Sequence, residues 1–162
     1  MPTAAASYHV TPIGVVRCAV AAPVDEAWGA VESTIVLDPQ LRPGLRGLEG
    51  FSHLIVVTFL HGATFDPARH LVRRPRGLAE LPELGIFAQR AKDRPNPLGV
   101  TCVTLLGVDA EGPRVRGLDA IDGTPVLDLK PYFPHFDLPG GPEAKALVRV
   151  PPWVDALMRG YF

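Results

Sequence analysis

The sequence predicts a mainly β protein with short helices and long loops, built as a single domain over residues 1–162. Three observations lead to that fold class. The apolar segments are short and are bounded by turn residues, which is typical of strands. The chain contains 18 prolines and 16 glycines, too many for a bundle of long helices. No helical segments separate the apolar runs, which argues against a parallel α/β sheet and leaves an antiparallel barrel or sandwich.

The individual elements follow from local patterns along the chain. Residues 51–60 form the strongest predicted strand, and their near-continuous apolarity predicts burial on both faces. After two prolines, Trp153, Leu157 and Tyr161 are spaced i, i+4, i+8, which predicts a short amphipathic helix within 153–162. The predicted strands are 10–17, 31–37, 51–60, 84–88, 98–106, 114–118 and 125–130, with 144–150 as a candidate last strand.

Several classes of protein are disfavoured by what the sequence lacks. Cys18 and Cys102 stand alone, so neither a disulfide framework nor a zinc motif is expected, and a reducing, cytoplasmic compartment is predicted. His53 and His61 lie eight residues apart without a third ligand, and we expect no metal site. The sequence has no glycine-rich dinucleotide or P-loop motif, no visible signal peptide and no apolar run long enough for a membrane span.

Charge is unevenly distributed, although the formal net charge is only −1. Residues 69–94 carry seven cations and three anions, a net of +4, and residues 119–137 carry four aspartates and one lysine, a net of −3. Arginine suits bidentate recognition of phosphate or carboxylate, but a solvated basic loop is an equally ordinary interpretation. The segment 61–82 is basic, contains proline and lacks periodicity, so it is the best candidate for a mobile loop that carries function.

Two blocks look more specific than packing requires. In residues 85–99, the run Arg94-Pro95-Asn96-Pro97 is stiffened by both prolines, so it either presents a side chain to a ligand or simply connects two strands. In residues 117–132, Asp119 and Asp122 lie three apart at a tight bend, where carboxylates and amides could converge on a ligand. The alternative is an Asx-turn in which the aspartates bond only their own backbone.

The order of these motifs resembles a known family. Phe51-Ser52-His53-Leu54, Phe59-Leu60-His61, Gly-Ile-Phe-Ala-Gln-Arg at 85–90, Arg-Pro-Asn-Pro-Leu-Gly at 94–99 and the whole 118–132 block occur in sequence. Over roughly residues 13–137 the chain resembles the S-adenosylmethionine-dependent tRNA methyltransferases that act on N6-threonylcarbamoyladenosine beside the anticodon. The resemblance implies a small antiparallel β-barrel, not a Rossmann fold, and a homodimer with its cofactor near the subunit boundary.

The resemblance also implies which residues contact S-adenosyl-L-methionine. These implied cofactor contacts are Gly29, Ala30, Val31, Leu60, His61, Arg90, Val100, Asp119, Ala120, Ile121 and Asp122. The chain departs from the family pattern at Gln89, where threonine is common, and at the triplet 91–93. It also ends 25 residues after Asp137, whereas longer members continue into another domain, so no separate C-terminal domain is expected.

The chemistry needs few protein groups, because a sulfonium methyl donor is already reactive and the protein mainly aligns the reactants and excludes water. The acceptor nitrogen is acylated, so a base would help, and Asp122 and His61 are the candidates. Arg73, Arg74, Arg76 and Arg94 are the predicted RNA-binding residues. Two other functions stay open: methylation of another RNA or a small molecule, and a non-catalytic S-adenosylmethionine-binding module.

Overall fold

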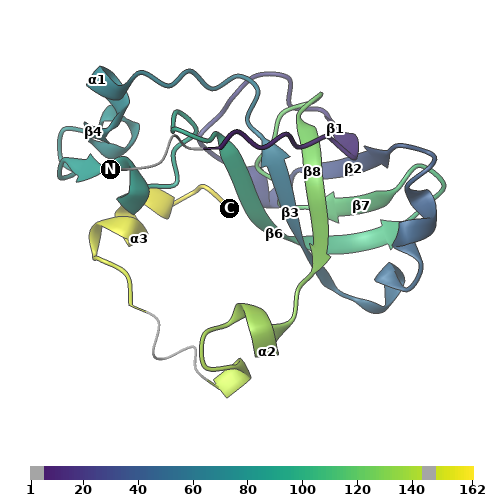
Figure 1. Ribbon diagram of the computed structural model, residues 1–162. Coiled ribbons are helices and arrows are strands. Elements are labelled where there is room, and N and C mark those ends of the chain that lie inside the picture. The colour runs from purple at the N-terminus through teal and green to yellow at the C-terminus, as the bar shows by residue number, and fades with distance from the viewer. Residues whose placement is uncertain (1–5, 144–148) are drawn as a thin grey trace.

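Six antiparallel strands close into a barrel in the order β1-β2-β7-β6-β3-β8 (Figure 1). This is a computed structural model, and it describes residues 6–143 and 149–162. The barrel strands are β1 (Gly14–Cys18), β2 (Glu32–Leu37), β3 (His53–Phe59), β6 (Leu98–Val108), β7 (Pro113–Arg116) and β8 (Pro125–Pro131). The smaller elements are β4 (Val72–Arg73), β5 (Leu84–Gly85), α1 (Pro67–His70), α2 (Pro134–Asp137) and α3 (Trp153–Met158), with 3-10 turns at Trp28–Ala30, Arg42–Leu45, Leu48–Gly50, Pro75–Gly77 and Ile86–Ala88.

The barrel core consists of branched side chains at alternate strand positions. A strand turns successive side chains to opposite faces, so one row from each strand points inward. Burying each such side chain contributes roughly 1.5–3 kcal/mol, and the core therefore accounts for barrel closure. The inward row contains Val16, Ile35, Leu37, Leu54, Val56, Val103, Val115 and Val126, all of them buried.

The predicted barrel is confirmed, but the strongest predicted strand is buried on one face only. In β3, Leu54 and Val56 are fully buried, whereas Ile55 and Val57 on the outer face are only half-buried. The prediction that this strand is buried on both faces is therefore wrong. The outer face of β3 continues into β6, where Leu98 and Val100 are more than two-fifths exposed.

Three predicted segments differ from the structure in extent. The strand expected at 84–88 is a two-residue strand followed by a 3-10 turn, because the Ile86 N–H bonds the Leu71 carbonyl and its side chain is buried. The helix expected within 153–162 ends at Met158, because Gly160 has a φ of 76°, which a helix cannot continue. Most of the candidate strand at 144–150 lies outside the described residues.

Three long connections meet at one end of the barrel. The β1–β2 connection (19–31), the β3–β6 connection (60–97) and the β7–β8 connection (117–124) all leave from strand ends that the antiparallel register places together. The segment 61–82 carries α1, β4 and a 3-10 turn, so it is locally structured. Figure 1 shows α3 on this same side, near β4, and α2 at the opposite end beyond β8. The described part of the chain contains no helix that could cross a membrane.

Candidate functional site

Backbone hydrogen bonds fix the β7–β8 connection against the strands beside it. The Gly117 N–H donates to the Val31 carbonyl at 3.0 Å, and the Asp122 N–H donates to the Val20 carbonyl at 2.7 Å. The Gly123 N–H completes the bend by donating to the Val16 carbonyl at 2.8 Å. The first two of these bonds join the connection that carries residues 119–122 to the β1–β2 connection that carries residues 29–31.

Asp119 lies at the centre of the candidate site, with a donor on each carboxylate oxygen. The Thr101 hydroxyl donates to Oδ1, and the Tyr161 hydroxyl donates to Oδ2 at 3.0 Å. Burial, together with the negative charge of Asp119, raises the pKa of Tyr161 well above its usual range. Tyr161 therefore remains protonated and acts as a hydrogen-bond donor throughout the physiological pH range.

Asp122 faces a different direction from Asp119. Its Oδ1 accepts the Cys18 N–H at 3.2 Å, and its Oδ2 pairs with the Arg17 guanidinium at 3.4 Å. The two carboxylates thus bind separate tertiary partners and do not converge on one point. The Asx-turn alternative is also wrong, because both aspartates bond groups outside their own loop. Between them, Ala120 is buried and its carbonyl accepts the Cys18 thiol at 3.5 Å.

The start of β6 brings the other predicted contacts beside this bend. The Arg90 guanidinium donates to the Val100 carbonyl, one residue before Thr101. The Leu60 N–H donates to the Pro97 carbonyl at 2.7 Å, so Leu60 packs along the same strand end. His61 follows in an exposed position. Leu60 and Arg90 thus bond Pro97 and Val100, which lie within four residues of Thr101 along the chain.

The segment 27–31 closes the other side of the site. Trp28 is buried, and its indole N–H donates to the Val24 carbonyl at 3.0 Å. Gly29 lies directly against Phe162, since a Cβ at Gly29 would be 2.6 Å from the Phe162 carbonyl carbon. A solvent-open hollow of about 550 Å³ adjoins this segment. It is lined by Val20, Val24, Asp25, Glu26, Ala27 and Val31.

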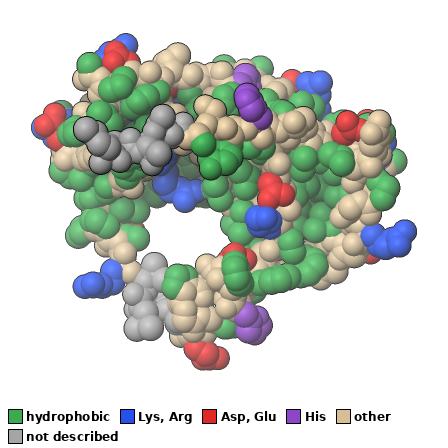
Figure 2. Space-filling view, viewed as in Figure 1, with side chains coloured by type: hydrophobic (Ala, Val, Ile, Leu, Met, Phe, Trp, Pro, Cys, Tyr) green, Lys and Arg blue, Asp and Glu red, His purple; other side chains and the backbone are tan. Residues whose placement is uncertain are grey.

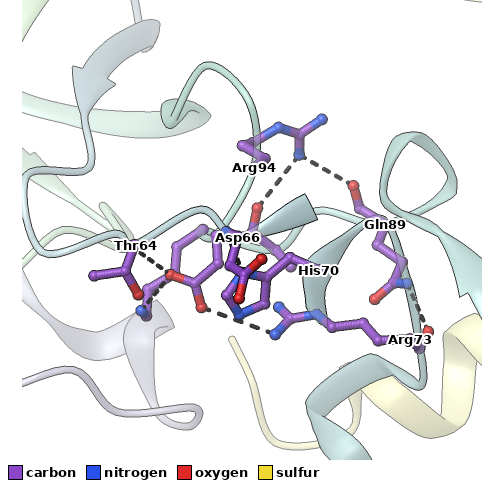
Figure 3. A network of polar contacts seen from close by, with 9 residues as sticks. Thr64, Asp66, His70, Arg73, Gln89 and Arg94 are labelled. Carbon is purple, nitrogen blue, oxygen red and sulfur yellow. Dashed lines mark hydrogen bonds and ion pairs between the residues drawn. The ribbon is translucent and has the colours of Figure 1, made fainter. Parts of the chain in front are cut away.

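Buried Asp93 organises the basic β3–β6 connection through contacts that include Thr64 and Arg73, which are labelled in Figure 3. It accepts the Thr64 N–H at 2.9 Å and the Lys92 ammonium at 2.8 Å, and Arg73 lies 3.8 Å away. Burial acts to raise the pKa of Asp93, but the hydrogen bonds from Lys92 and Thr64 outweigh it and lower that pKa below its usual value. The carboxylate is therefore charged at neutral pH and holds the connection together.

A second set of contacts in Figure 3 joins β4, β5 and the segment that follows them. The Gln89 side-chain amide donates to the Arg73 carbonyl at 2.9 Å and to the Leu84 carbonyl at 2.8 Å. Arg94 donates back to the Gln89 carbonyl at 3.1 Å. Gln89, which stands where threonine is common in the family, is thus a buried clamp between the two short strands. Arg94 stabilises its own loop, consistent with the stiff-connector interpretation of 94–97.

The four arginines predicted to bind RNA each contact a group in the protein. Arg73 faces Asp93, and Arg74 donates to the Leu81 carbonyl. The Arg76 guanidinium lies 5.2 Å from the centre of the Tyr161 ring, a cation–π contact. Arg94 bonds the backbone of its own loop. Each of these four guanidinium groups therefore has a partner within the protein.

Sequence reasoning missed two residues that contact the predicted site. Thr101 follows the predicted contact Val100 on β6, and the period of two along that strand could have placed its hydroxyl inward. Tyr161 was assigned to the apolar stripe of a helix, and nothing in its spacing with Trp153 and Leu157 distinguishes packing from a polar contact. The described residues contain no cluster of three His, Cys, Asp or Glu side chains that could hold a metal ion.

Comparison with known proteins agrees with this architecture. The family described as tRNA-methyltransferase O N-terminal domain matches residues 20–138. A probable S-adenosyl-L-methionine-binding protein of Methanothermobacter thermautotrophicus is 41% identical over 133 residues, which cover 80% of this chain and 93% of that protein. A similar protein of Pyrococcus abyssi is 37% identical over 132 residues, covering 78% of this chain and 69% of its own length.

Longer enzymes share the same region. The tRNA (adenine(37)-N6)-methyltransferase of Escherichia coli is 43% identical over 94 residues, 56% of this chain and 40% of the enzyme. The crystal structure of TrmO from Pseudomonas aeruginosa superposes with a TM-score of 0.71 at 30% identity, covering 93% of this chain and 63% of that one. The chain therefore spans less than two thirds of these two proteins. It belongs to the tRNA-methyltransferase O family of S-adenosyl-L-methionine-dependent methyltransferases.

Proposed function

We propose that this protein methylates N6 of N6-threonylcarbamoyladenosine beside the anticodon of tRNA, with S-adenosyl-L-methionine as the donor. The observation that supports the proposal best is the meeting of three connections at one end of the barrel. There the Thr101–Asp119 contact joins the start of β6, with Leu60 and Arg90, to the bend that is bonded to Val31. The Escherichia coli relative is named for methylation of adenine 37 at N6, which suggests the same atom as the acceptor here.

The proposed cofactor contacts lie on the barrel strands and on the connections between them. Gly29–Val31, Leu60, His61, Arg90, Val100 and the bend 119–122 supply apolar contacts, backbone groups and two half-buried carboxylates. The bound cofactor would supply an electrophilic methyl on a positively charged sulfur, so the protein needs no nucleophile of its own. The Cys102 thiol is not activated for that role, because partial desolvation and the nearby Asp137 carboxylate raise its pKa. What the site must do is align the acceptor nitrogen and exclude water.

His61 and Asp122 remain the proposed bases for the acceptor nitrogen. His61 is exposed at the end of β3, and Asp122 faces β1. We expect His61→Ala and Asp122→Asn to lower the single-turnover rate of methyl transfer roughly 10²-fold or more, a far larger loss than the loss of cofactor affinity. Rapid-quench kinetics with radiolabelled cofactor measures the rate, and calorimetry measures the affinity. An unchanged rate in either variant removes that residue from the role of base.

The arginines of the β3–β6 connection are proposed to face the RNA. Each cation that contacts a phosphate adds roughly one unit to the slope of the logarithm of the RNA binding constant against the logarithm of salt concentration. Removing such a cation therefore flattens this slope by about one unit. We expect the triple variant Arg73→Ala, Arg74→Ala, Arg76→Ala to flatten that slope by about two to three units. Binding of tRNA would be measured by filter retention from low to high salt. Arg116→Ala, at an exposed ion pair of β7, is the control, and an unaltered slope in the triple variant argues against this surface.

A homodimer is proposed to form through the outer face of β3 and β6. This face carries half-buried Ile55 and Val57 beside exposed Phe59, Leu98 and Val100. Figure 2 shows apolar side chains gathered over part of the barrel surface. A contiguous apolar face of this kind is characteristic of interfaces.

The dimer proposal is tested with a charge placed in the centre of that face. Cys102 pairs with Ile55 across β3 and β6 and is exposed, so its side chain would project into the interface. We expect wild type to elute as a dimer and Cys102→Arg to elute as a folded monomer in light-scattering chromatography. Cys18→Ala, at the far side of the barrel, should leave the mass unchanged. A monomeric wild type would contradict the proposal directly.

The function itself is best tested by examining bulk tRNA from a strain that lacks this gene. Digestion to nucleosides and mass spectrometry should show loss of the methyl group from N6-methyl-N6-threonylcarbamoyladenosine, with the unmethylated nucleoside accumulating. Loss of a different methylated nucleoside would identify another RNA as the acceptor. An unchanged nucleoside profile together with cofactor binding by the purified protein would favour a non-catalytic S-adenosylmethionine-binding module.

A further inference from the structure

We propose that Tyr161 is a positioning residue of the cofactor site, and that it acts by fixing the carboxylate of Asp119. The inference rests on the proposed function, because Asp119 is a proposed cofactor contact. Its basis is the hydrogen bond of 3.0 Å from the Tyr161 hydroxyl to Oδ2 of Asp119. Thr101 occupies the other oxygen, so the rotamer of the carboxylate is determined from both sides.

The segment that carries Tyr161 is bound to the site by its backbone as well. The Ala27 N–H donates to the Gly160 carbonyl at 2.9 Å, and the Trp28 N–H donates to the Tyr161 carbonyl at 2.8 Å. These two bonds attach the Tyr161 segment to Ala27 and Trp28, the residues immediately before Gly29. Gly29 begins the first of the proposed cofactor stretches. Tyr161 therefore bridges two stretches that are more than 80 residues apart in the sequence.

Backbone strain is concentrated at the contacts of the same segment. In the described ranges, residues 6–143 and 149–162, the non-glycine residues with positive φ are Ala27 at 60° and Arg76 at 50°. Ala27 bonds Gly160, and Arg76 lies over the Tyr161 ring. Such conformations cost free energy and tend to persist at sites where the surrounding contacts serve function. Both strained residues of this part of the chain therefore contact the segment Gly160–Tyr161.

The chemistry of Tyr161 and Asp119 indicates that the hydroxyl orients the carboxylate and does not compete with a ligand for it. A carboxylate can accept about four hydrogen bonds, and Thr101 and Tyr161 use two of them. Asp119 thus keeps acceptor capacity for a hydroxyl or an ammonium group of a ligand. A phenol that stays protonated donates to the carboxylate at every physiological pH, so it orients the acceptor without neutralising it. The expected consequence of losing the hydroxyl is weaker cofactor binding with intact methyl-transfer chemistry.

The test compares Tyr161→Phe with Tyr132→Phe in the full chain. Tyr132 follows β8 at the opposite end of the barrel, where it packs edge-on against His53. Phenylalanine keeps the ring under Arg76 and removes only the hydroxyl. We expect Tyr161→Phe to raise the dissociation constant for S-adenosyl-L-methionine about tenfold in calorimetry. The KM for the cofactor should rise by a similar factor with kcat within about twofold. Tyr132→Phe should match wild type in all three measurements.

Each outcome has a distinct meaning. Tenfold weaker binding in Tyr161→Phe, with unchanged kcat, supports positioning. Equal binding by wild type and Tyr161→Phe overturns the inference and leaves the proposed function intact. Tighter binding by Tyr161→Phe also overturns it, since the hydroxyl would then compete with the ligand for Asp119. If wild type gives no heat with S-adenosyl-L-methionine, the proposed function fails first and the inference fails with it.

Discussion

Replacing Asp119 with asparagine should weaken binding of S-adenosyl-L-methionine roughly 10- to 100-fold, which is the loss expected when a charged hydrogen-bond acceptor is neutralised. Asparagine has nearly the same shape, so packing around the bend should survive. The amide keeps one acceptor oxygen, but its NH₂ group must face one of the two donors that now bond the carboxylate, Thr101 or Tyr161. Calorimetry with the purified variant measures the affinity, and thermal unfolding monitors the fold.

The matched control for this experiment is Asp128→Asn. Asp128 lies on β8 of the same barrel and forms an ion pair of 2.7 Å with Lys130, both of them solvent-accessible. Exposed pairs of this kind contribute about 0–1 kcal/mol to stability, so Asp128→Asn should bind the cofactor as wild type does. Wild-type affinity in Asp119→Asn would remove this carboxylate from the cofactor site. The hollow beside Val31 would then be the next candidate for the binding site.

Asp119 and Asp122 show how far local sequence patterns can lead. Their spacing correctly predicted a tight bend, but the Asx-turn considered for it is wrong. The spacing could not predict that one carboxylate binds Thr101 and Tyr161 while the other binds Cys18 and Arg17. Those partners come from distant segments, and their identity depends on the barrel register rather than on the loop itself.

Strand periodicity was informative for the inside of the barrel and misleading for its outside. Leu54 and Val56 follow the inward row, as a buried strand requires. Ile55 and Val57 are just as apolar, but they lie on an outer face that this chain covers only in part. A sequence does not reveal whether an apolar residue is buried by its own chain or by a partner, so continuous apolarity was read as two internal faces.

The fold is expected to be most sensitive to substitution at Gly112, in the turn between β6 and β7. Gly112 is buried with a φ of 150°, a conformation that side chains rarely adopt, and a Cβ there would overlap the carbonyl oxygen of Ile35. Since that carbonyl belongs to the backbone of β2, the clash cannot be relieved by a rotamer change. We expect Gly112→Ala to lower the free energy of unfolding by about 3 kcal/mol or more, a drop of roughly 6–12 °C in Tm.

Gly44→Ala separates this effect from the general cost of replacing glycine. Gly44 lies in the 3-10 turn Arg42–Leu45, and a Cβ there would meet no atom within 4 Å. Its free energy of unfolding should therefore stay within about 0.5 kcal/mol of wild type. Urea unfolding of the three proteins side by side makes the comparison. Equal stability of Gly112→Ala and Gly44→Ala would mean that the β6–β7 turn does not pack against β2 as described, and the closure of the barrel at that edge would have to be revised.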